Sequence, residues 1–121
     1  MLKMIAPFEM GICVDDLENM IAFYGDVLGF KLISKIDVPA DKSNEAGFTS
    51  GGYTIVRMQT NYGERIKLVR PVTLPHSRTS GKEVLSKKGN VFLTFIVEDL
   101  KHTVSRIKDT DAPIRTQGSI M

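Results

Sequence analysis

Residues 8–30, FEMGICVDDLENMIAFYGDVLGF, constrain the fold of this chain more than any other stretch. Residues 8–14 alternate between an apolar face and a face of small and polar residues, which predicts a strand. The apolar face consists of Phe8, Met10, Ile12 and Val14. The opposite face consists of Glu9, Gly11 and Cys13. We expect the apolar face to pack against a helix and the opposite face to line a cavity.

A helix is predicted directly after this strand. Asp15 is in position to cap its N-terminus, and Glu18 three residues later completes a capping box. The apolar residues recur at helical spacing and form one stripe, which consists of Leu17, Met20, Ile21, Tyr24 and Leu28. Gly29 supplies the left-handed residue that ends the helix. Residues 8–30 therefore predict a βα unit.

Three further strands are predicted, at residues 30–38, 53–60 and 64–70. The last two form a hairpin through Asn61-Tyr62-Gly63. In the last strand one face carries Ile66 and Leu68, and the other carries Arg65, Lys67 and Val69. The order of elements up to this point is β-α-β-β-β.

The segment between the second and third strands, residues 39–52, is polar and rich in turn formers. A short helix at residues 41–46 is an option, and Gly51-Gly52 marks a turn before the next strand. The segment is either a lid over the cavity or a long surface loop.

A weaker copy of the opening unit begins near residue 90. Residues 91–97 alternate again, with an apolar face of Val91, Leu93, Phe95 and Val97. Asp99 can cap a helix whose apolar stripe is Leu100, Val104 and Ile107. The switch from strand to helix is Val14-Asp15-Asp16-Leu17 in the first copy and Val97-Glu98-Asp99-Leu100 in the second. This internal repeat predicts two modules with the same start.

These elements predict an α+β fold in a single domain, residues 1–121. A complete βαβββ module occupies residues 7–71, a linker residues 72–88, and an incomplete second module residues 89–121. After Asp109 there is room for one strand, at residues 112–116. We expect the second module to be truncated and its sheet edge to be unpaired, so that a second copy of the chain covers it in a homodimer.

The composition excludes several classes of partner. The net charge is only +2 over 121 residues and the basic residues are scattered, which argues against nucleic acid and against an anionic membrane surface. No apolar run approaches the roughly 20 residues of a membrane span, and the N-terminus lacks the pattern of a signal peptide. One cysteine rules out an internal disulfide. We expect a cytoplasmic protein that binds a small molecule.

Four phrases of this sequence are similar to recurrent phrases of one protein family. They are Ala22-Phe23-Tyr24, Val27-Leu28-Gly29-Phe30, Leu68-Val69-Arg70-Pro71 and Phe95-Ile96-Val97-Glu98-Asp99-Leu100. Over residues 7–110 the chain resembles the vicinal oxygen chelate superfamily of glyoxalases, bleomycin-resistance proteins and extradiol dioxygenases. It is most similar to the glyoxalase-like (lactoylglutathione lyase-like) members. The resemblance implies paired βαβββ modules whose curved mixed sheets enclose a cavity, commonly completed in a dimer.

In enzymes of this family a divalent metal in the cavity chelates neighbouring substrate oxygens. The resemblance places the first metal ligand at Glu9, the second at Lys67 and the third at Phe92. Zinc, nickel, iron and manganese need imidazole or oxygen donors, so Glu9 is a weak candidate ligand. Lys67 is a cation and Phe92 has no lone pair, so Phe92 instead lines an apolar pocket or fills it. We therefore expect the family's metal site to be degraded.

The candidate ligand-pocket residues are Glu9, Cys13, Arg57, Arg65, Lys67, Phe92 and Thr94. Glu9 is the best catalytic candidate, and its pairing with Lys67 gives either a site that binds a polar substrate or a structural salt bridge. Arg57 and Arg65 suit a carboxylate or phosphate, although such residues are more often solvated strand charges. Cys13 is expected to be a small buried residue that fills space.

Three functions are compatible with these residues. The leading hypothesis is a protein that binds a small molecule in a sheet-lined cavity, with the usual metal chemistry degraded or lost. The first alternative is a metal-dependent lactoylglutathione lyase-like lyase, epimerase or dioxygenase, which uses Glu9 and ligands from a partner chain or a missing C-terminus. The second is an antibiotic-sequestering resistance protein, which needs no metal and holds the drug between two subunits.

Overall fold

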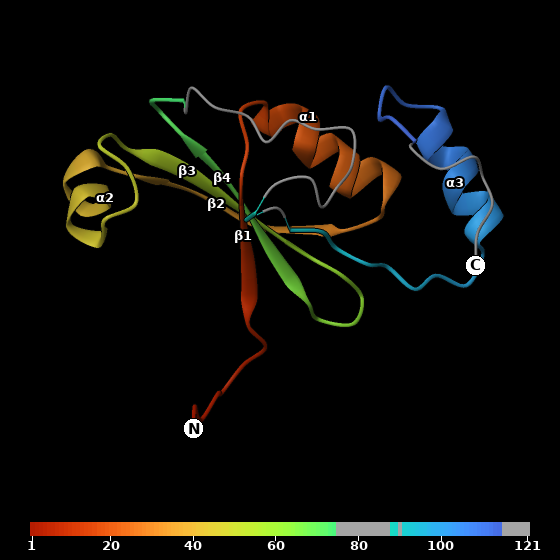
Figure 1. Ribbon diagram of the computed structural model, residues 1–121, viewed down its shortest axis with the longest axis horizontal. Coiled ribbons are helices and arrows are strands. Elements are labelled where there is room, and N and C mark those ends of the chain that lie inside the picture. Colours follow the sequence, from red (N-terminus) through yellow and green to blue (C-terminus); the bar gives the residue numbers. More distant parts are fainter. Residues whose placement is uncertain (75–87, 90, 115–121) are drawn as a thin grey trace. The chain divides into compact units, whose positions relative to one another are not determined.

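The computed structural model describes residues 1–74, 88–89 and 91–114 (Figure 1). The chain divides into two compact units, Met1–Leu74 and Pro75–Met121. The first unit holds a sheet with its helices, and the described part of the second holds one helix.

The first unit is built on a four-stranded mixed sheet. Its strands are β1 (Glu9–Cys13), β2 (Lys31–Val38), β3 (Tyr53–Gln59) and β4 (Arg65–Pro71). They lie in the order β1-β4-β3-β2, with β1 parallel to β4 and the other neighbours antiparallel. Every bound lies within one residue of the predicted one. The α+β class and the βαβββ order of the first module are confirmed.

The helix after β1 begins one residue later than predicted. Helix α1 (Leu17–Ala22) has Asp16 as its N-cap, and the Asn19 N–H donates to Asp16 Oδ1 at 3.1 Å. The prediction that Asp15 caps the helix is therefore wrong. The Asp15 carbonyl instead accepts a hydrogen bond from Arg70 Nε at 2.9 Å, which ties the start of this turn to β4.

The predicted helix changes its winding half-way. After α1 the chain continues as a π-helix, η1 (Phe23–Val27), in which the Leu28 N–H donates to the Phe23 carbonyl. Gly29 ends the helical segment with a φ of 80°, as predicted, because the left-handed region favours glycine.

The hydrophobic core lies between the helical segment and one face of the sheet. Its centre consists of Val56, Met58 and Leu68, which are at most 1% exposed. The helical side contributes Leu17, Tyr24 and Phe30, all of them buried. Burial of one such side chain contributes about 1.5–3 kcal/mol. Phe8 was expected to join this core and is 74% exposed, because it precedes β1, which is an edge strand of the sheet.

The segment between β2 and β3 contains the predicted short helix, α2 (Ala40–Ala46). The segment is held in place by its own contacts. Ser43 is fully buried and its hydroxyl donates to the Thr49 carbonyl at 3.0 Å. The ring of Phe48 stacks edge-on against Tyr53 of β3, with centroids 5.4 Å apart. Side chains of the segment therefore pack against one end of the sheet.

The described part of the second unit contains α3 (Leu100–Lys108), which Asp99 caps as predicted. The Asp99 side chain accepts from the His102 N–H at 3.0 Å. The strand predicted at residues 91–97 is not formed. Alternation alone does not make a strand, because the backbone needs a partner strand, and the described residues of this unit supply none.

Two predictions about the ends of this unit fall partly outside the described residues. Residues 112–114 of the predicted strand at 112–116 are irregular, and residues 115–116 are not described. Most of the predicted linker, residues 75–87, is likewise not described. Among the described helices, none is long and apolar enough to cross a membrane.

Candidate functional site

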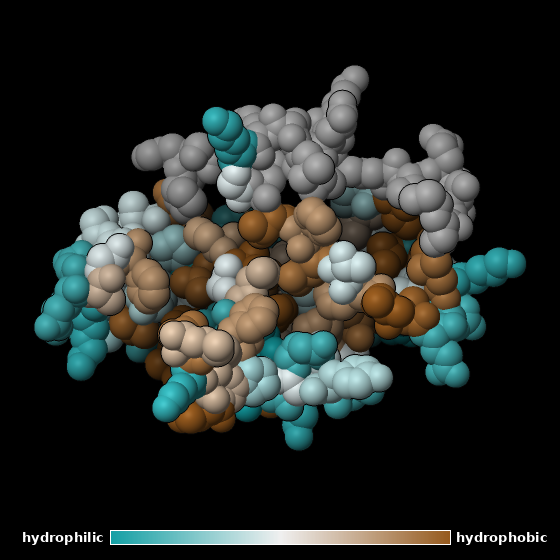
Figure 2. All heavy atoms as spheres, turned by 60° about the horizontal axis from the view of Figure 1, so that its bottom comes forward, coloured by the Kyte–Doolittle hydropathy of each residue, from teal (hydrophilic) through white to brown (hydrophobic). Residues whose placement is uncertain are grey.

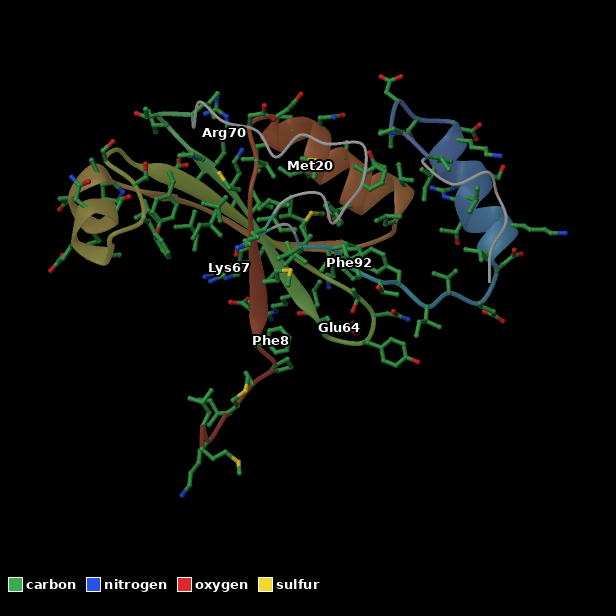
Figure 3. All side chains as sticks on the ribbon, viewed as in Figure 1. Phe8, Met20, Glu64, Lys67, Arg70 and Phe92 are labelled. Atoms are coloured by element: carbon green, nitrogen blue, oxygen red, sulfur yellow. The ribbon has the colours of Figure 1, made fainter. Side chains whose placement is uncertain are left out.

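The strand register brings four of the predicted site residues together on one face of the sheet. Glu9 of β1 pairs with Arg65 of β4, and Lys67 of β4 pairs with Arg57 of β3. Residues two apart on a strand point to the same side, so these side chains share the face opposite the core. Figure 3 shows Lys67 and Met20 of α1 on opposite sides of the sheet. We call these four residues the Glu9 cluster.

The Glu9 carboxylate is the centre of this cluster. Its oxygens lie 3.5 Å from Arg57 Nε, 3.9 Å from Arg65 Nη1 and 3.8 Å from Lys67 Nζ. The side chains are only partly exposed, from 25% for Glu9 to 42% for Arg65. The pairing of Glu9 with Lys67 is present as the sequence suggested. Arg57 and Arg65 are more than solvated strand charges, because both face the same carboxylate.

The charges of the Glu9 cluster do not balance. Three cations surround one carboxylate, which leaves a net charge of +2. Glu9 Oε2 is buried and accepts no hydrogen bond among the described residues. Arg65 Nε donates instead to Gln59 Oε1 at 2.7 Å. The cations are thus held near the carboxylate, and most of their N–H donors have no acceptor within the described part of the chain.

An apolar surface adjoins the cluster on the same face. Two residues beyond Arg57 and Lys67 lie Ile55 and Val69, which pair with each other across β3 and β4. Val69 is half-buried, whereas Ile55 is covered and only 9% exposed, so Val69 supplies the accessible apolar surface here. The face therefore changes from charged to apolar over one step along the strands.

Cys13 lies beside this apolar surface, since it pairs with Val69. The sequence led us to expect a buried, space-filling cysteine, whereas Cys13 is exposed. It belongs to an edge strand, and its neighbour on the same face is Gly11, where an added Cβ would meet nothing within 4 Å. No described side chain covers this part of the face closely enough to bury a thiol.

The described residues do not suit a divalent metal of the family type. They contain no group of three or more His, Cys, Asp and Glu side chains placed to hold an ion. Glu9 is an oxygen donor, but the nearest charged groups to it are cations, which oppose a second cation electrostatically. Lys67, which the resemblance places at the second ligand position, has its ammonium 3.8 Å from Glu9 Oε1.

Phe92 and Thr94, the remaining predicted pocket residues, belong to the second unit. Phe92 is 62% exposed, and Thr94 is exposed as well. Neither lies in a regular strand, and their role in a pocket stays a prediction.

Two features of the first unit were not predicted from the sequence. Gln59 holds Arg65, and its alternation with Arg57 along β3 would have placed it on the same face. A pocket of about 380 Å³ lies on the opposite, helical side of the sheet. Its lining residues are Glu18, Ile21, Ala22, Gly25, Asp26, Phe30, Leu32 and Met58. No periodicity signals this pocket, because it forms where the π-helical turn meets β2.

Comparison with known proteins agrees with the fold. The chain is similar to a crystal structure of a glyoxalase family protein from Bacillus cereus, with a TM-score of 0.68 and 27% identity over 89% of this chain and 73% of that one. The structure of SMU.1112c has the same fold, with a TM-score of 0.52 and 15% identity over 90% of this chain and 75% of that one. No curated protein sequence matches.

The family model that matches covers nearly the whole chain. It is described as Glyoxalase/Bleomycin resistance protein/Dioxygenase superfamily, and it matches residues 5–117. The match includes the βαβββ module, the Glu9 cluster and α3. The chain therefore belongs to the Glyoxalase/Bleomycin resistance protein/Dioxygenase superfamily.

Proposed function

We propose that this superfamily member binds a small molecule on the sheet face around Glu9, with the metal chemistry of the family's enzymes degraded or lost. The observation that supports this most directly is the surrounding of the Glu9 carboxylate by Arg57, Arg65 and Lys67 within 3.9 Å. Polar groups that converge next to an apolar surface are typical of ligand sites. The same three cations disfavour a divalent ion at this carboxylate.

A homodimer is part of this proposal. The described residues of the second unit expose large apolar side chains, including Phe92 at 62% and Ile96 at 98%. Soluble proteins rarely leave such residues together in water. A second copy of the chain would cover them, and light scattering at micromolar concentration measures this directly. A monomeric mass would remove the dimer from the proposal and leave the ligand site in place.

Metal analysis of the purified full chain tests the central claim. The protein is incubated with zinc, nickel, iron(II) and manganese in turn, passed over a desalting column, and analysed by mass spectrometry of the elements. We expect well under one ion per chain in the wild type and no difference in Glu9→Gln. One ion per chain that is lost in Glu9→Gln, but kept in Glu18→Gln, would establish the metal-dependent alternative instead. Glu18 is a suitable control because its side chain is 80% exposed on α1.

Ligand binding is tested separately by nuclear magnetic resonance. A library of small polar fragments of all charges is added to ¹⁵N-labelled protein, and amide shifts of β1, β3 and β4 are followed. Shifts that cluster on Glu9, Arg57 and Lys67 support the proposal. A library that perturbs no amide of these strands would refute it.

A further inference from the structure

The unbalanced charge of the Glu9 cluster indicates the class of ligand. We propose that the sheet face binds a small organic oxyanion, a carboxylate or a phosphate, through Arg57, Arg65 and Lys67, with the apolar part of the ligand over Val69. This inference rests on the proposed function and narrows it to one chemistry.

Among the residues that the structure describes, the donors of the cluster have few polar partners. The side chains of Arg57 and Lys67 form ion pairs with Glu9 at 3.5 and 3.8 Å, which is longer than a good hydrogen bond. Arg65 uses Nε for Gln59 and keeps its terminal amino groups. A guanidinium presents its N–H groups as a planar fork, which matches two oxygens of a carboxylate or phosphate.

Glu9 acts in this site as a partial counter-charge that competes with the ligand for the cations. Its Oε2 is buried, and it holds three cations within 3.9 Å that would otherwise repel one another. It neutralises only one of the three charges, so the face still attracts an anion. The three cations would therefore contact the Glu9 carboxylate on one side and an oxygen of the ligand on the other.

The strands also define the orientation of the ligand. Next to Lys67 on the same face lies the half-buried Val69, one step further along β4 and beside the covered Ile55 of β3. An anion with an apolar body gains both the ion pairs and the contact with Val69, whereas a free inorganic ion gains only the ion pairs. Burial of apolar surface on binding is favourable. The site therefore favours an organic acid or organic phosphate over inorganic phosphate.

Calorimetry with matched probes tests this inference on the full chain. The probes are benzoate, phenyl phosphate, inorganic phosphate and the neutral benzamide, each at low salt and at 0.5 M NaCl. We expect benzoate or phenyl phosphate to bind at least ten-fold more tightly than benzamide. The ratio of the benzoate and phenyl phosphate affinities shows whether a carboxylate or a phosphate is preferred. Binding should weaken at high salt, because the cluster is partly exposed.

Four variants separate the anion site from a general effect of charge. Arg57→Gln and Lys67→Gln should each weaken anion binding about ten-fold, because each removes a charged donor. Lys35→Gln makes the same charge change at an exposed lysine that pairs with Glu18, and it should alter binding less than two-fold. Glu9→Gln should tighten anion binding about three- to ten-fold, because it removes the competing negative charge. Circular dichroism confirms that each variant is folded.

The outcomes distinguish this inference from the proposed function. If benzamide binds as well as the anions, or if Lys35→Gln weakens binding as much as Lys67→Gln, the oxyanion assignment is wrong while a small-molecule site remains. Loss of anion binding in a folded Glu9→Gln would also overturn it, because removal of a competing negative charge should strengthen anion binding by the three cations. If neither the anions nor any neutral fragment binds this face, both statements fail together.

Discussion

Glu9 and Arg57 approach to 3.5 Å although their strands are not neighbours, since β4 lies between β1 and β3. Neighbouring strands are about 4.8 Å apart, so the two backbones lie about 10 Å apart and only long side chains can meet. The ion pair passes over β4, close to Lys67 and Arg65. It therefore links the edge strand to the interior of the sheet, in addition to the backbone hydrogen bonds between β1 and β4.

The first prediction concerns the stability of this arrangement. Glu9→Gln should lower the free energy of unfolding by about 1–2 kcal/mol, because three cations then face one another without a counter-charge. Urea denaturation at 20 mM salt measures the loss. About half of it should return in 1 M NaCl, where repulsion between partly exposed charges is screened.

Glu18→Gln is the matched control for this change. Its partner Lys35 lies 3.5 Å away, and both side chains are more than half exposed. Exposed ion pairs contribute little, so the control should change stability by less than about 0.5 kcal/mol. Equal effects of the two substitutions would mean that the Glu9 cluster is not an interacting unit.

The positions of the strands could be predicted from the sequence, whereas most of the contacts between side chains of different strands could not. Alternation predicted β1 to β4 within one residue, because the side-chain period of a strand is recorded in the strand itself. The gathering of Arg57 and Arg65 around Glu9 was not predicted, because it depends on β1 pairing with β4, and this register is a property of distant segments.

Contacts between distant segments also account for the predictions that were wrong. Residues 91–97 alternate as well as β1 does, but no described strand pairs with them. The exposure of Cys13 likewise depends on what covers the face, which alternation does not record. The alternation of apolar and polar residues thus predicted where β1 to β4 begin and end. The pairing of strands in the fold determined which residues came together in a site.

The second prediction tests the corrected helix start. Asp16→Ala should destabilise the first unit by about 1 kcal/mol, because the Asn19 N–H loses its acceptor at 3.1 Å. Asp16→Asn keeps a side-chain oxygen in the same place and should stay within about 0.3 kcal/mol of the wild type. Thermal unfolding measures both. A loss as large in Asp16→Asn as in Asp16→Ala would show that charge, and not capping, matters at this position.

The third prediction concerns the tight approach of two backbone segments. A Cβ on Gly52 would lie 2.6 Å from the Val38 carbonyl oxygen, so Gly52→Ala forces the ends of β2 and β3 apart. We expect a loss of about 1–3 kcal/mol in unfolding free energy, as for other overpacked sites. The neighbouring Gly51→Ala is the control, because its added Cβ would be 3.5 Å from Thr73 Oγ1, an ordinary contact. Similar losses in the two variants would contradict this account.

The fourth prediction follows from the burial of Tyr24 in the core. Desolvation raises the pKa of the Tyr24 hydroxyl from its ordinary value of 10.0, so the folded state holds this proton more tightly than the unfolded chain does. The contribution to stability is therefore complete below pH 10.0 and is lost as the pH rises from there through the raised pKa of the folded state. The slope is at most about 1.4 kcal/mol per pH unit.

Tyr24→Phe should remove this part of the alkaline destabilisation. The substitution keeps the edge-on contact with Phe30, whose ring centroid lies 5.2 Å away, so the packing of the core is preserved. Urea unfolding between pH 8 and pH 11 compares the variant with the wild type. Tyr62→Phe removes the same hydroxyl from a ring that is 89% exposed, and it should leave the pH dependence in place. If Tyr24→Phe and the wild type lose stability in parallel above pH 10, then the burial of Tyr24 does not control the alkaline limit of this fold.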